Sequence, residues 1–346
     1  MSKRTGRNSL QKNLTDDYLS GQMDEDRAEG VQRFGQRSKH AEQNKAVRTG
    51  HARQEANAAA IDALPAGRVV QVFSRYCEVL GDSDGSRRIC QVRKTLGKLS
   101  DTHVVVGDRV RFLDQPSLDA HNRAEGIIER IEPRQTILTR TDSFKGQLNS
   151  PIVANAEQMF IVASIVQPRV KWGLIDRMII AANSGKLRPI LCLNKVDLAD
   201  DEELADAREK LAHYHTLGVT TIETSVTENL GLDEARKLID GKVTVLAGHS
   251  GVGKSSLVNT LEPGVDIRVG EISVVNDKGK HTTTSARIYP LGNGLTGEVI
   301  DTPGVKLFGL WNVTTETLDD FFPDVAAETS PEWRSESYAR IRRSLK

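Results

Sequence analysis

The sequence predicts an α/β domain with a mostly parallel sheet, preceded by an all-β barrel and followed by a short helical tail. Three observations lead to this prediction. Between residues 67 and 132, short β-branched runs alternate with Gly and Asp turns, which is typical of a small barrel. From about residue 150, apolar runs of strand length alternate with helical patterns, which predicts a parallel sheet covered on both faces. One such strand and helix flank the glycine-rich turn GHSGVGKSS.

The bulk composition indicates a protein of two or three domains that stays in the cytoplasm. The chain has 346 residues, 38% of them hydrophobic, and its longest apolar runs have the length of strands rather than of membrane spans. Basic residues near the N-terminus are not followed by an apolar stretch, so we expect no secretory signal. Cys77, Cys90 and Cys192 are too scattered for a metal or redox pair, which predicts reduced, mostly buried thiols.

The composition of residues 1–65 predicts a polar arm that is disordered when free. These residues include too few aromatic and branched side chains to offset the entropy of ordering. A solvated tail and an RNA-contacting arm explain its basic ends equally well. For the barrel, residues 66–138, an OB-fold is the best match. The formal net charge of the chain is zero, so any contact with nucleic acid has to come from local basic clusters. One stretch of the barrel can follow a nucleic-acid backbone or be an ordinary solvated face. It contains Arg87, Arg88, Arg93, Lys94 and Lys98.

The α/β domain is expected over residues 139–310 and the helical tail over residues 311–346. Ser330 and Pro331 predict the cap and the first position of a final helix. Apolar residues recur on one side of that helix. They are Tyr338, Ile341 and Leu345.

The strongest motif is G-x-x-x-x-G-K-S at residues 248–255, between the predicted strand KVTVLA and the predicted helix SSLVNTL. In such a loop, successive backbone N–H groups converge on phosphate oxygens, and the helix N-terminus adds positive potential. Lys254 is expected to bridge the β- and γ-phosphates, and Ser255 to bind Mg²⁺. His249 fills a position that tolerates other residues. The predicted phosphate-binding residues are Gly248, His249, Ser250, Gly251, Val252, Gly253, Lys254, Ser255 and Ser256.

A second motif, NKVD, predicts recognition of guanine. The Asp197 carboxylate can accept hydrogen bonds from N1–H and the exocyclic amino group of guanine, and a site built on such bonds rejects adenine by roughly 10⁴. Lys195 is expected to lie over the base plane, and Asn194 to tie this loop to the phosphate loop. Thr224 and Ser225 of ETSV can close the base pocket. By itself NKVD also fits a helix-capping turn, but here it follows the predicted strand RPILCLN, at the edge where such sheets bind ligands.

Two further segments complete the predicted site. In DTPG, Asp301 reaches the Mg²⁺ shell and Gly304 offers a backbone N–H to the γ-phosphate. In KGKHTTTSA, Thr283 or Thr284 binds Mg²⁺ when the γ-phosphate is present. The predicted metal ligands are therefore Ser255, Thr283, Thr284 and Asp301.

The order of the motifs identifies the domain as a circularly permuted P-loop GTPase domain. Ras-like GTPases run from the phosphate loop through the switch threonine and DxxG to NKxD. Here NKVD and ETSV come first, and the phosphate loop, HTTT and DTPG follow. The cycle of segments is the same, and only the position of the chain ends differs. Such a change is tolerable because domain termini often lie close together.

With its predicted barrel and the segments GHSGVGKSSLVN, GKHTTT and DTPGVKLFGLW, the sequence resembles the RsgA (YjeQ) family of GTPases that depend on the small ribosomal subunit. The resemblance covers roughly residues 66–322. It implies a protein that binds the 30S subunit and its 16S rRNA, assists late maturation of that subunit, and hydrolyses GTP slowly alone and faster on the subunit. A monomer is expected.

The sequence departs from that family at its end. Family members usually carry a C-terminal zinc site of three Cys and one His, whereas this sequence has no Cys after Cys192 and no His after His281. We therefore expect no zinc site there. Val305 stands where Ras-type enzymes place the Gln that orients water, as in the family, which predicts slow intrinsic hydrolysis. His281 is the candidate to orient the water, with an exposed loop histidine of no role as the alternative. The predicted catalytic residues are His281, Lys254 and Thr284.

Two other functions are compatible with parts of this pattern. A GTP-dependent RNA-binding switch or scaffold with incidental turnover is compatible with Val305. A P-loop kinase for a small metabolite conflicts with NKVD and DTPG. The permuted order also suggests a mechanism: DTPG runs directly into the C-terminal helices, so loss of the γ-phosphate can displace the tail.

Overall fold

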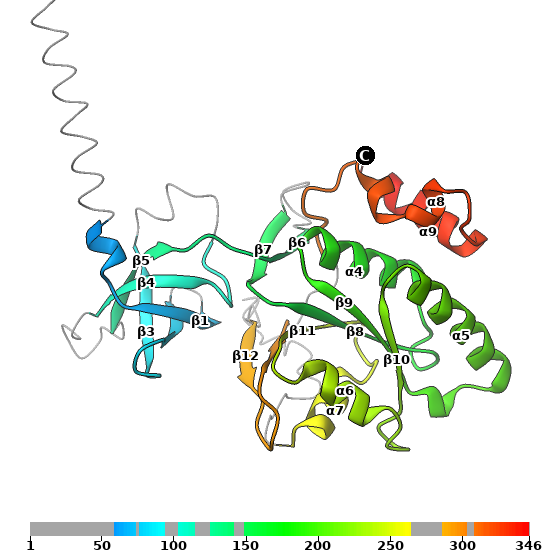
Figure 1. Cartoon of the computed structure of the whole chain (residues 1–346), viewed down its shortest axis with the longest axis horizontal. Coiled ribbons are helices and arrows are strands. Elements are labelled where there is room, and N and C mark those ends of the chain that lie inside the picture. The colour runs from blue at the N-terminus through cyan, green and yellow to red at the C-terminus, as the bar shows by residue number, and fades with distance from the viewer. Residues whose placement is uncertain are drawn as a thin grey trace, which may run out of the picture. The chain divides into compact units, whose positions relative to one another are not determined.

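The computed structural model describes residues 59–73, 76–93, 103–114, 125–141, 149–263, 286–302 and 308–345. It divides the chain into Met1–Ala63 and a second compact unit, Leu64–Lys346, which holds the barrel, the α/β part and the tail. The strands of the described residues form one sheet of eleven strands and a separate sheet of two (Figure 1). None of the described helices is both long and apolar enough to cross a membrane.

The first five strands close into the predicted barrel. They pair in the order β1-β2-β3-β5-β4, and β1 also pairs with β4, which closes the ring. Strands β3 and β5 run parallel, while the other neighbours in the ring run antiparallel. This topology confirms the OB-like barrel. Alternate residues such as Val69, Val79 and Phe112 fill its core. The strands are β1 (Ala66–Val72), β2 (Tyr76–Gly81), β3 (Arg87–Val92), β4 (Arg109–Asp114) and β5 (Gly126–Ile131).

The barrel is attached to the rest of the unit by backbone and side-chain contacts. Strand β1 pairs with β12 (Arg287–Pro290) through Gln71, and Arg68 forms an ion pair with Glu298. A separate hairpin, β6 (Ile137–Thr141) and β7 (Asn149–Ala154), follows the barrel. The border predicted after residue 138 therefore falls inside β6.

The α/β part contains six strands in the order β10-β9-β8-β11-β13-β12. The first five run parallel, and β12 runs antiparallel to β13. Strand β11 lies between β8, the first strand of this part in the chain, and β13, the last. The ends of the domain thus lie on either side of its central strand, as a circular permutation requires. The strands are β8 (Gln158–Ser164), β9 (Arg188–Asn194), β10 (Thr220–Thr224), β11 (Val243–Ala247), β12, and β13 (Glu298–Asp301).

Helices cover both faces of this sheet, and the two-residue period of a strand explains how (Figure 1). All of β8 is buried. Met159 and Ile161 contribute to the core under α4 and α5, whereas Phe160 and Val162 contribute to the core under α6 and α7. A strand that is apolar on both faces therefore specifies a covered parallel sheet. The helices are α4 (Trp172–Ser184), α5 (Asp201–Thr216), α6 (Leu232–Ile239) and α7 (Lys254–Leu261).

The three cysteines are free and buried, as predicted. Burial raises the pKa of Cys77, Cys90 and Cys192 to about 12 in each case. At neutral pH these thiols are therefore protonated and unreactive, because the thiolate is the reactive form.

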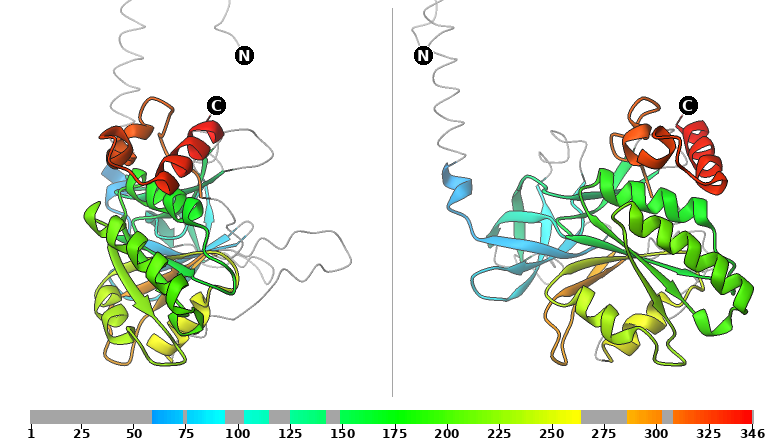
Figure 2. Two further views of the ribbon diagram at one scale, coloured as in Figure 1. Left: turned by 90° about the vertical axis from the view of Figure 1, so that its right-hand side faces the viewer. Right: turned by 45° about the vertical axis from the view of Figure 1, so that its right-hand side comes forward.

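The tail is helical, as predicted, and packs on the outer side of α4 (Figure 2). It consists of η2 (Leu318–Phe321), α8 (Pro323–Ala326) and α9 (Glu332–Ser344). Ile341 is buried in the main core, and Tyr338 and Leu345 pack against it, so the predicted apolar side is correct. The predicted cap is wrong in detail. Pro331 precedes the first helical residue, and the Ser330 hydroxyl lies 2.7 Å from that of Ser335 instead of capping the helix.

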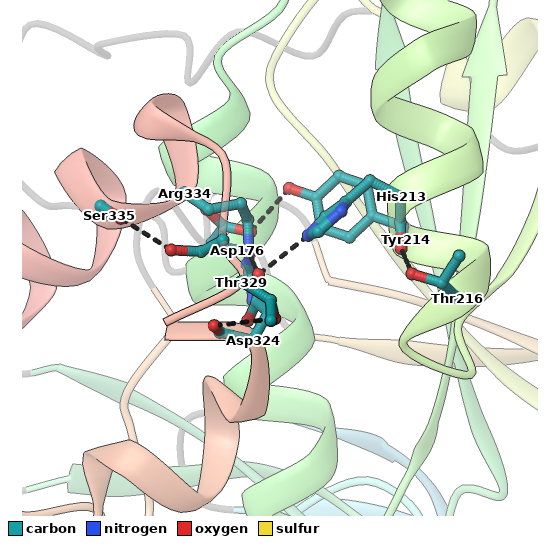
Figure 3. Close-up of polar contacts among 9 residues, drawn as sticks. Asp176, His213, Tyr214, Thr216, Asp324, Thr329, Arg334 and Ser335 are labelled. Carbon is teal, nitrogen blue, oxygen red and sulfur yellow. Dashed lines mark hydrogen bonds and ion pairs between the residues drawn. The ribbon is translucent and has the colours of Figure 1, made fainter. Parts of the chain in front are cut away.

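A buried arginine fastens the tail to the α/β part (Figure 3). Arg334 of α9 is 3% exposed and forms ion pairs with Asp176 of α4 and Asp324 of α8. The Tyr214 hydroxyl of α5 donates to Asp176 at 2.6 Å, and the His213 ring lies 2.8 Å from Asp324. Four helices therefore meet at one guanidinium group. We call these five residues the Arg334 node.

The two carboxylates of the Arg334 node differ electrostatically. Burial raises the pKa of Asp176, against the opposing effect of Arg334. At Asp324 burial acts in the same sense, but hydrogen bonds from Arg334 and His213 outweigh it, so its pKa lies below the ordinary value. A buried charge group of this kind is sensitive to the loss of one member, because the remaining charges lose their compensation.

Replacing Arg334 by Met should destabilise the protein by about 3–5 kcal/mol, because two buried carboxylates would lose their cation. Arg343→Met, at an exposed position of the same helix, is the matched control and should change the free energy of unfolding by less than about 0.5 kcal/mol. Urea unfolding followed by circular dichroism measures both. Equal stability of the two variants would contradict the role given to the Arg334 node.

Candidate functional site

The predicted site residues that the structure describes lie at the carboxyl edge of the parallel sheet. The phosphate loop follows β11, the NKVD loop follows β9, Thr224 ends β10, and Asp301 ends β13. Open α/β sheets bind ligands at this edge, because the strand ends and helix starts leave backbone groups free there. Segments that are distant in the sequence thus reach one place through the strand order.

Glycines in the phosphate loop stand where a side chain has no room. Gly248 has φ of +140°, and a Cβ added there would lie 2.2 Å from the Val162 carbonyl oxygen. Gly253 has φ of +95°, and its Cβ would lie 2.5 Å from the Asn194 amide nitrogen. These contacts explain why the loop can pack tightly on β8 and on the NKVD loop.

Asn194 joins the base-reading loop to the phosphate loop. Its side chain is 1% exposed. The amide Nδ2 donates to the Val252 carbonyl at 3.0 Å, and Oδ1 accepts the Thr224 hydroxyl at 3.0 Å. The predicted tie between the two loops is therefore present. Thr224, which the sequence suggested for the wall of the base pocket, is fully buried and holds Asn194 in place.

Lys195 connects a third loop that the sequence did not indicate. The residue has a left-handed backbone with φ of +62°. Its Nζ donates to the carbonyls of Gln167 and Gly251, at 2.7 Å in each case. Gln167 belongs to the segment between β8 and α4, residues 165–171, which we call the β8–α4 loop. The Pro168 carbonyl accepts the Ser164 hydroxyl at 2.8 Å. Pro168, after an apolar strand, is the sequence signal that could have indicated this loop.

Asp197 lies in the short helix η1 (Val196–Leu198), where hydroxyl groups hold its carboxylate. Hydrogen bonds from Ser225 and then Thr227 keep the pKa of Asp197 below its ordinary value. The Thr227 hydroxyl donates at 2.9 Å. Thr227 is a supporting residue that the sequence reasoning missed, because no motif marks it. Like other carboxylates of ordinary or lowered pKa, the Asp197 carboxylate is ionised at neutral pH and can accept two hydrogen bonds from one purine edge.

Lys254 and Asp301 place opposite charges near the phosphate loop. The Lys254 Nζ donates to the carbonyls of Gly248 at 3.0 Å and His249 at 2.9 Å. Burial lowers the pKa of Lys254 and raises the pKa of Asp301, and each charge partly offsets the effect on the other. Ser255 follows Lys254 at the start of α7. Hydroxyl and carboxylate oxygens are the donors that Mg²⁺ prefers, and a cation would offset the burial of Asp301, so Ser255 and Asp301 fit this metal.

Several predicted residues lie outside the described part of the chain. They are His281, Thr283, Thr284, Gly304 and Val305.

His249, Ser250 and Ser256 are described and exposed. The His249 Nδ1 lies 2.9 Å from the Ser250 carbonyl. Within the described ranges, no three His, Cys, Asp or Glu side chains are grouped as metal ligands would be. The absence of a zinc site from the chain stays a prediction.

Comparison with known proteins gives consistent matches. Residues 131–311 match the family model described as RsgA GTPase. The small ribosomal subunit biogenesis GTPase RsgA of Photorhabdus laumondii is 38% identical over 258 residues, covering 74% of this chain and 70% of that protein. A protein of the same name from Pseudomonas aeruginosa, strain LESB58, is 40% identical over 256 residues, with the same two coverages of 74% and 70%.

Two solved structures share the fold. The crystal structure of YjeQ from Thermotoga maritima matches with a TM-score of 0.61 and 26% identity, over 81% of this chain and 98% of that chain. The structure of YloQ, described as a circularly permuted GTPase, matches with a TM-score of 0.55 and 23% identity, over 82% of this chain and 95% of that chain. The permuted fold predicted from the motif order is therefore confirmed.

Asp197→Asn should exchange a preference for guanine nucleotides for a preference for xanthine nucleotides. The amide can donate to the 2-oxo group of xanthine, whereas it presents a donor to the amino group of guanine. GTP affinity should fall by about 10³-fold or more, since a donor would face a donor in the pocket. Asp201→Asn, at an exposed position near the start of α5, is the control and should bind GTP normally. Titration with GTP and XTP checks this. A variant that still preferred GTP would remove Asp197 from the base pocket.

Proposed function

This chain belongs to the RsgA GTPase family, and from that membership we propose that it is a GTPase of small ribosomal subunit biogenesis. It binds the 30S subunit, contacts the 16S rRNA, and assists late steps of maturation. It acts as a monomer in the cytoplasm. GTP hydrolysis is slow in the free protein and faster on the subunit. One observation carries the nucleotide assignment: Asn194 holds the guanine reader against the phosphate loop, with its amide 3.0 Å from the Val252 carbonyl.

The proposed mechanism assigns separate tasks to the residues of this edge. Asp197, whose carboxylate accepts hydrogen bonds from Ser225 and Thr227, selects guanine. Backbone N–H groups of residues 248–255 hold the phosphates, and Lys254 bridges the β- and γ-phosphates. Bound Mg²⁺ would offset the charge of these phosphates, and Ser255 and Asp301 would hold it.

The step that breaks the β-γ phosphoanhydride requires an oriented water. Val305 cannot orient a water by hydrogen bonding, because its side chain is apolar. His281 is our candidate for this task, and Thr283 or Thr284 would hold Mg²⁺ once the γ-phosphate is present. Contact with the subunit would hold this segment in its active arrangement, which accounts for slow turnover in the free protein.

GTP turnover with and without purified small subunits tests the enzyme assignment. We expect the subunits to raise turnover by about tenfold or more, which corresponds to about 1.4 kcal/mol in the barrier. ATP is the control substrate and should be neither bound nor hydrolysed, since adenine offers no donor to Asp197 at the ring nitrogen. If subunits leave the rate of GTP turnover unchanged, while binding to the subunit still depends on GTP, the result would favour the switch or scaffold. Preference for ATP would favour a P-loop kinase.

The permuted order allows a direct coupling between the nucleotide and the tail. Phe308 comes four residues after Gly304 of DTPG. Arg177 of α4 donates to the Phe308 carbonyl at 3.2 Å, and its other guanidinium arm donates to the Ser344 hydroxyl of α9 at 3.1 Å. In our proposal, Arg177 transmits a displacement of the segment after DTPG to the last helix, so that GTP and GDP set different affinities for the subunit.

The measured quantity is the affinity for the subunit with a non-hydrolysable GTP analogue bound, divided by the affinity with GDP bound. Arg177→Gln should reduce this ratio to about half or less, because both contacts of Arg177 would be weakened. The affinity for the nucleotides themselves should change by less than about twofold. Arg343→Gln removes a charge from the same end of α9 and should leave the ratio unchanged. An unchanged ratio in Arg177→Gln would refute this coupling. Removing all residues after 312 is a less specific test, because it also takes Phe322 and Ile341 out of the core.

A further inference from the structure

The barrel arginines that the sequence suggested for nucleic-acid contact form ion pairs with carboxylates. Arg87 pairs with Glu78 at 3.1 Å. Arg88 pairs with both Asp84 and Asp114, at 2.7 Å in each case, and Arg93 pairs with Glu129 at 2.7 Å. Lys94 and Lys98 lie outside the described residues. A cation that already faces a carboxylate contributes little net attraction for a phosphate, because binding must first separate the existing pair.

Three other cations surround the start of α4 and have no carboxylate partner among the described residues. Arg169 and Lys171 belong to the β8–α4 loop, and Arg340 belongs to α9. All three side chains are exposed, and none forms an ion pair with any residue in the described ranges. The Arg340 guanidinium lies over the first turn of α4, since a Cβ added at Gly173 would be 3.3 Å from it. We call Arg169, Lys171 and Arg340 the α4 patch.

Two residues of the α4 patch border a hollow beside the phosphate loop. Arg169 and Lys171 line this shallow hollow together with His249 and Val252 of the phosphate loop. Its floor is apolar and comes from the end of β8 and from α4, including Leu174. Two members of the patch, Arg169 and Lys171, therefore lie beside the loop that holds the nucleotide phosphates.

The β8–α4 loop is mechanically joined to the phosphate loop. Lys195 donates to the carbonyls of both Gln167 and Gly251. A Cβ added at Gly251 would lie 3.6 Å from the ring of Pro168. A ligand that binds Arg169 or Lys171 therefore binds to a loop that contacts the phosphate loop through Lys195 and through Pro168.

We propose that the α4 patch binds the phosphodiester backbone of RNA in the small ribosomal subunit, next to the bound nucleotide. This inference rests on the proposed function, which supplies an RNA-rich partner. Cations that form no ion pair with a described residue match the charge of an RNA backbone. Because Lys195 joins the β8–α4 loop to the phosphate loop, a contact at Arg169 and Lys171 can act on the phosphate loop. The Arg334 node contributes indirectly, because it holds α9 and therefore Arg340 against α4.

The test compares two full-length variants that lose the same number of charges. Arg169→Gln, Lys171→Gln and Arg340→Gln together remove the α4 patch, and Arg87→Gln, Arg88→Gln and Arg93→Gln together serve as the barrel control. Affinity for purified small subunits and for protein-free small-subunit RNA is measured across a range of salt concentrations. The patch variant should lose about tenfold or more in both affinities, and the slope of log affinity against log salt should fall by about 2, as expected for three lost phosphate contacts. The barrel control should stay within about twofold of the unmodified protein.

A charge-retaining variant separates electrostatics from structure. Arg169→Lys with Arg340→Lys keeps all three positive charges and should keep most of the affinity, since lysine also binds phosphate as a point charge. Thermal unfolding of every variant checks that the fold is intact. Loss of affinity in the lysine variant equal to that in the glutamine variant would point to a damaged fold and overturn the proposal.

The remaining outcomes are also decisive. Loss of subunit binding with normal binding to protein-free RNA would assign the α4 patch to a protein contact and overturn the RNA assignment. A barrel control that loses as much as the patch variant would show that only net charge matters, which would also overturn it. If the unmodified protein binds RNA through the patch but the subunits do not change its rate of GTP turnover, the proposed function fails while the inference stands.

Discussion

The nucleotide site depends on one buried amide. Asn194 is 1% exposed, and its two polar atoms are satisfied by Val252 of the phosphate loop and by Thr224 at the end of β10. A buried amide without partners is costly, so the three segments are held in one arrangement. That arrangement sets the distance between the NKVD loop and the phosphate loop. Lys195 adds the β8–α4 loop to this arrangement, because it donates to the carbonyls of Gln167 in that loop and of Gly251 in the phosphate loop.

The same constraint explains why the unusual order of motifs is harmless. A parallel sheet brings strand ends to one edge whatever the order in which the chain visits the strands. With β11 central and flanked by β8 and β13, the chain can begin or end the domain on either side of the phosphate loop. The permutation does change which segment follows the last motif of the site in the sequence. After DTPG the chain continues to Phe308, which Arg177 joins to α9.

Charges in this protein are used in two different ways. In the Arg334 node, a cation is buried between two carboxylates and fixes the position of the tail helices. In the barrel, arginines pair with carboxylates at the surface, where such pairs add little stability and leave little free positive charge. Cations without carboxylate partners in the described residues therefore carry more weight for RNA recognition than the density of arginine in the sequence suggests. The structure directs attention from the barrel hairpin to the start of α4.

The sequence by itself determined the barrel, the alternating strands and helices, the phosphate loop, the position of the NKVD loop and the permuted order. Each depends on the spacing of neighbours along the chain, which physical chemistry translates directly into local structure. Only the tertiary structure decided which side chains support these motifs. Thr227 lies 30 residues from Asp197, and Arg334 lies 158 residues from Asp176, so no local pattern could connect them. Pairing of the barrel arginines was equally invisible, because it depends on which strands lie side by side. Long-range contacts of this kind arise from packing, and sequence spacing carries no record of them.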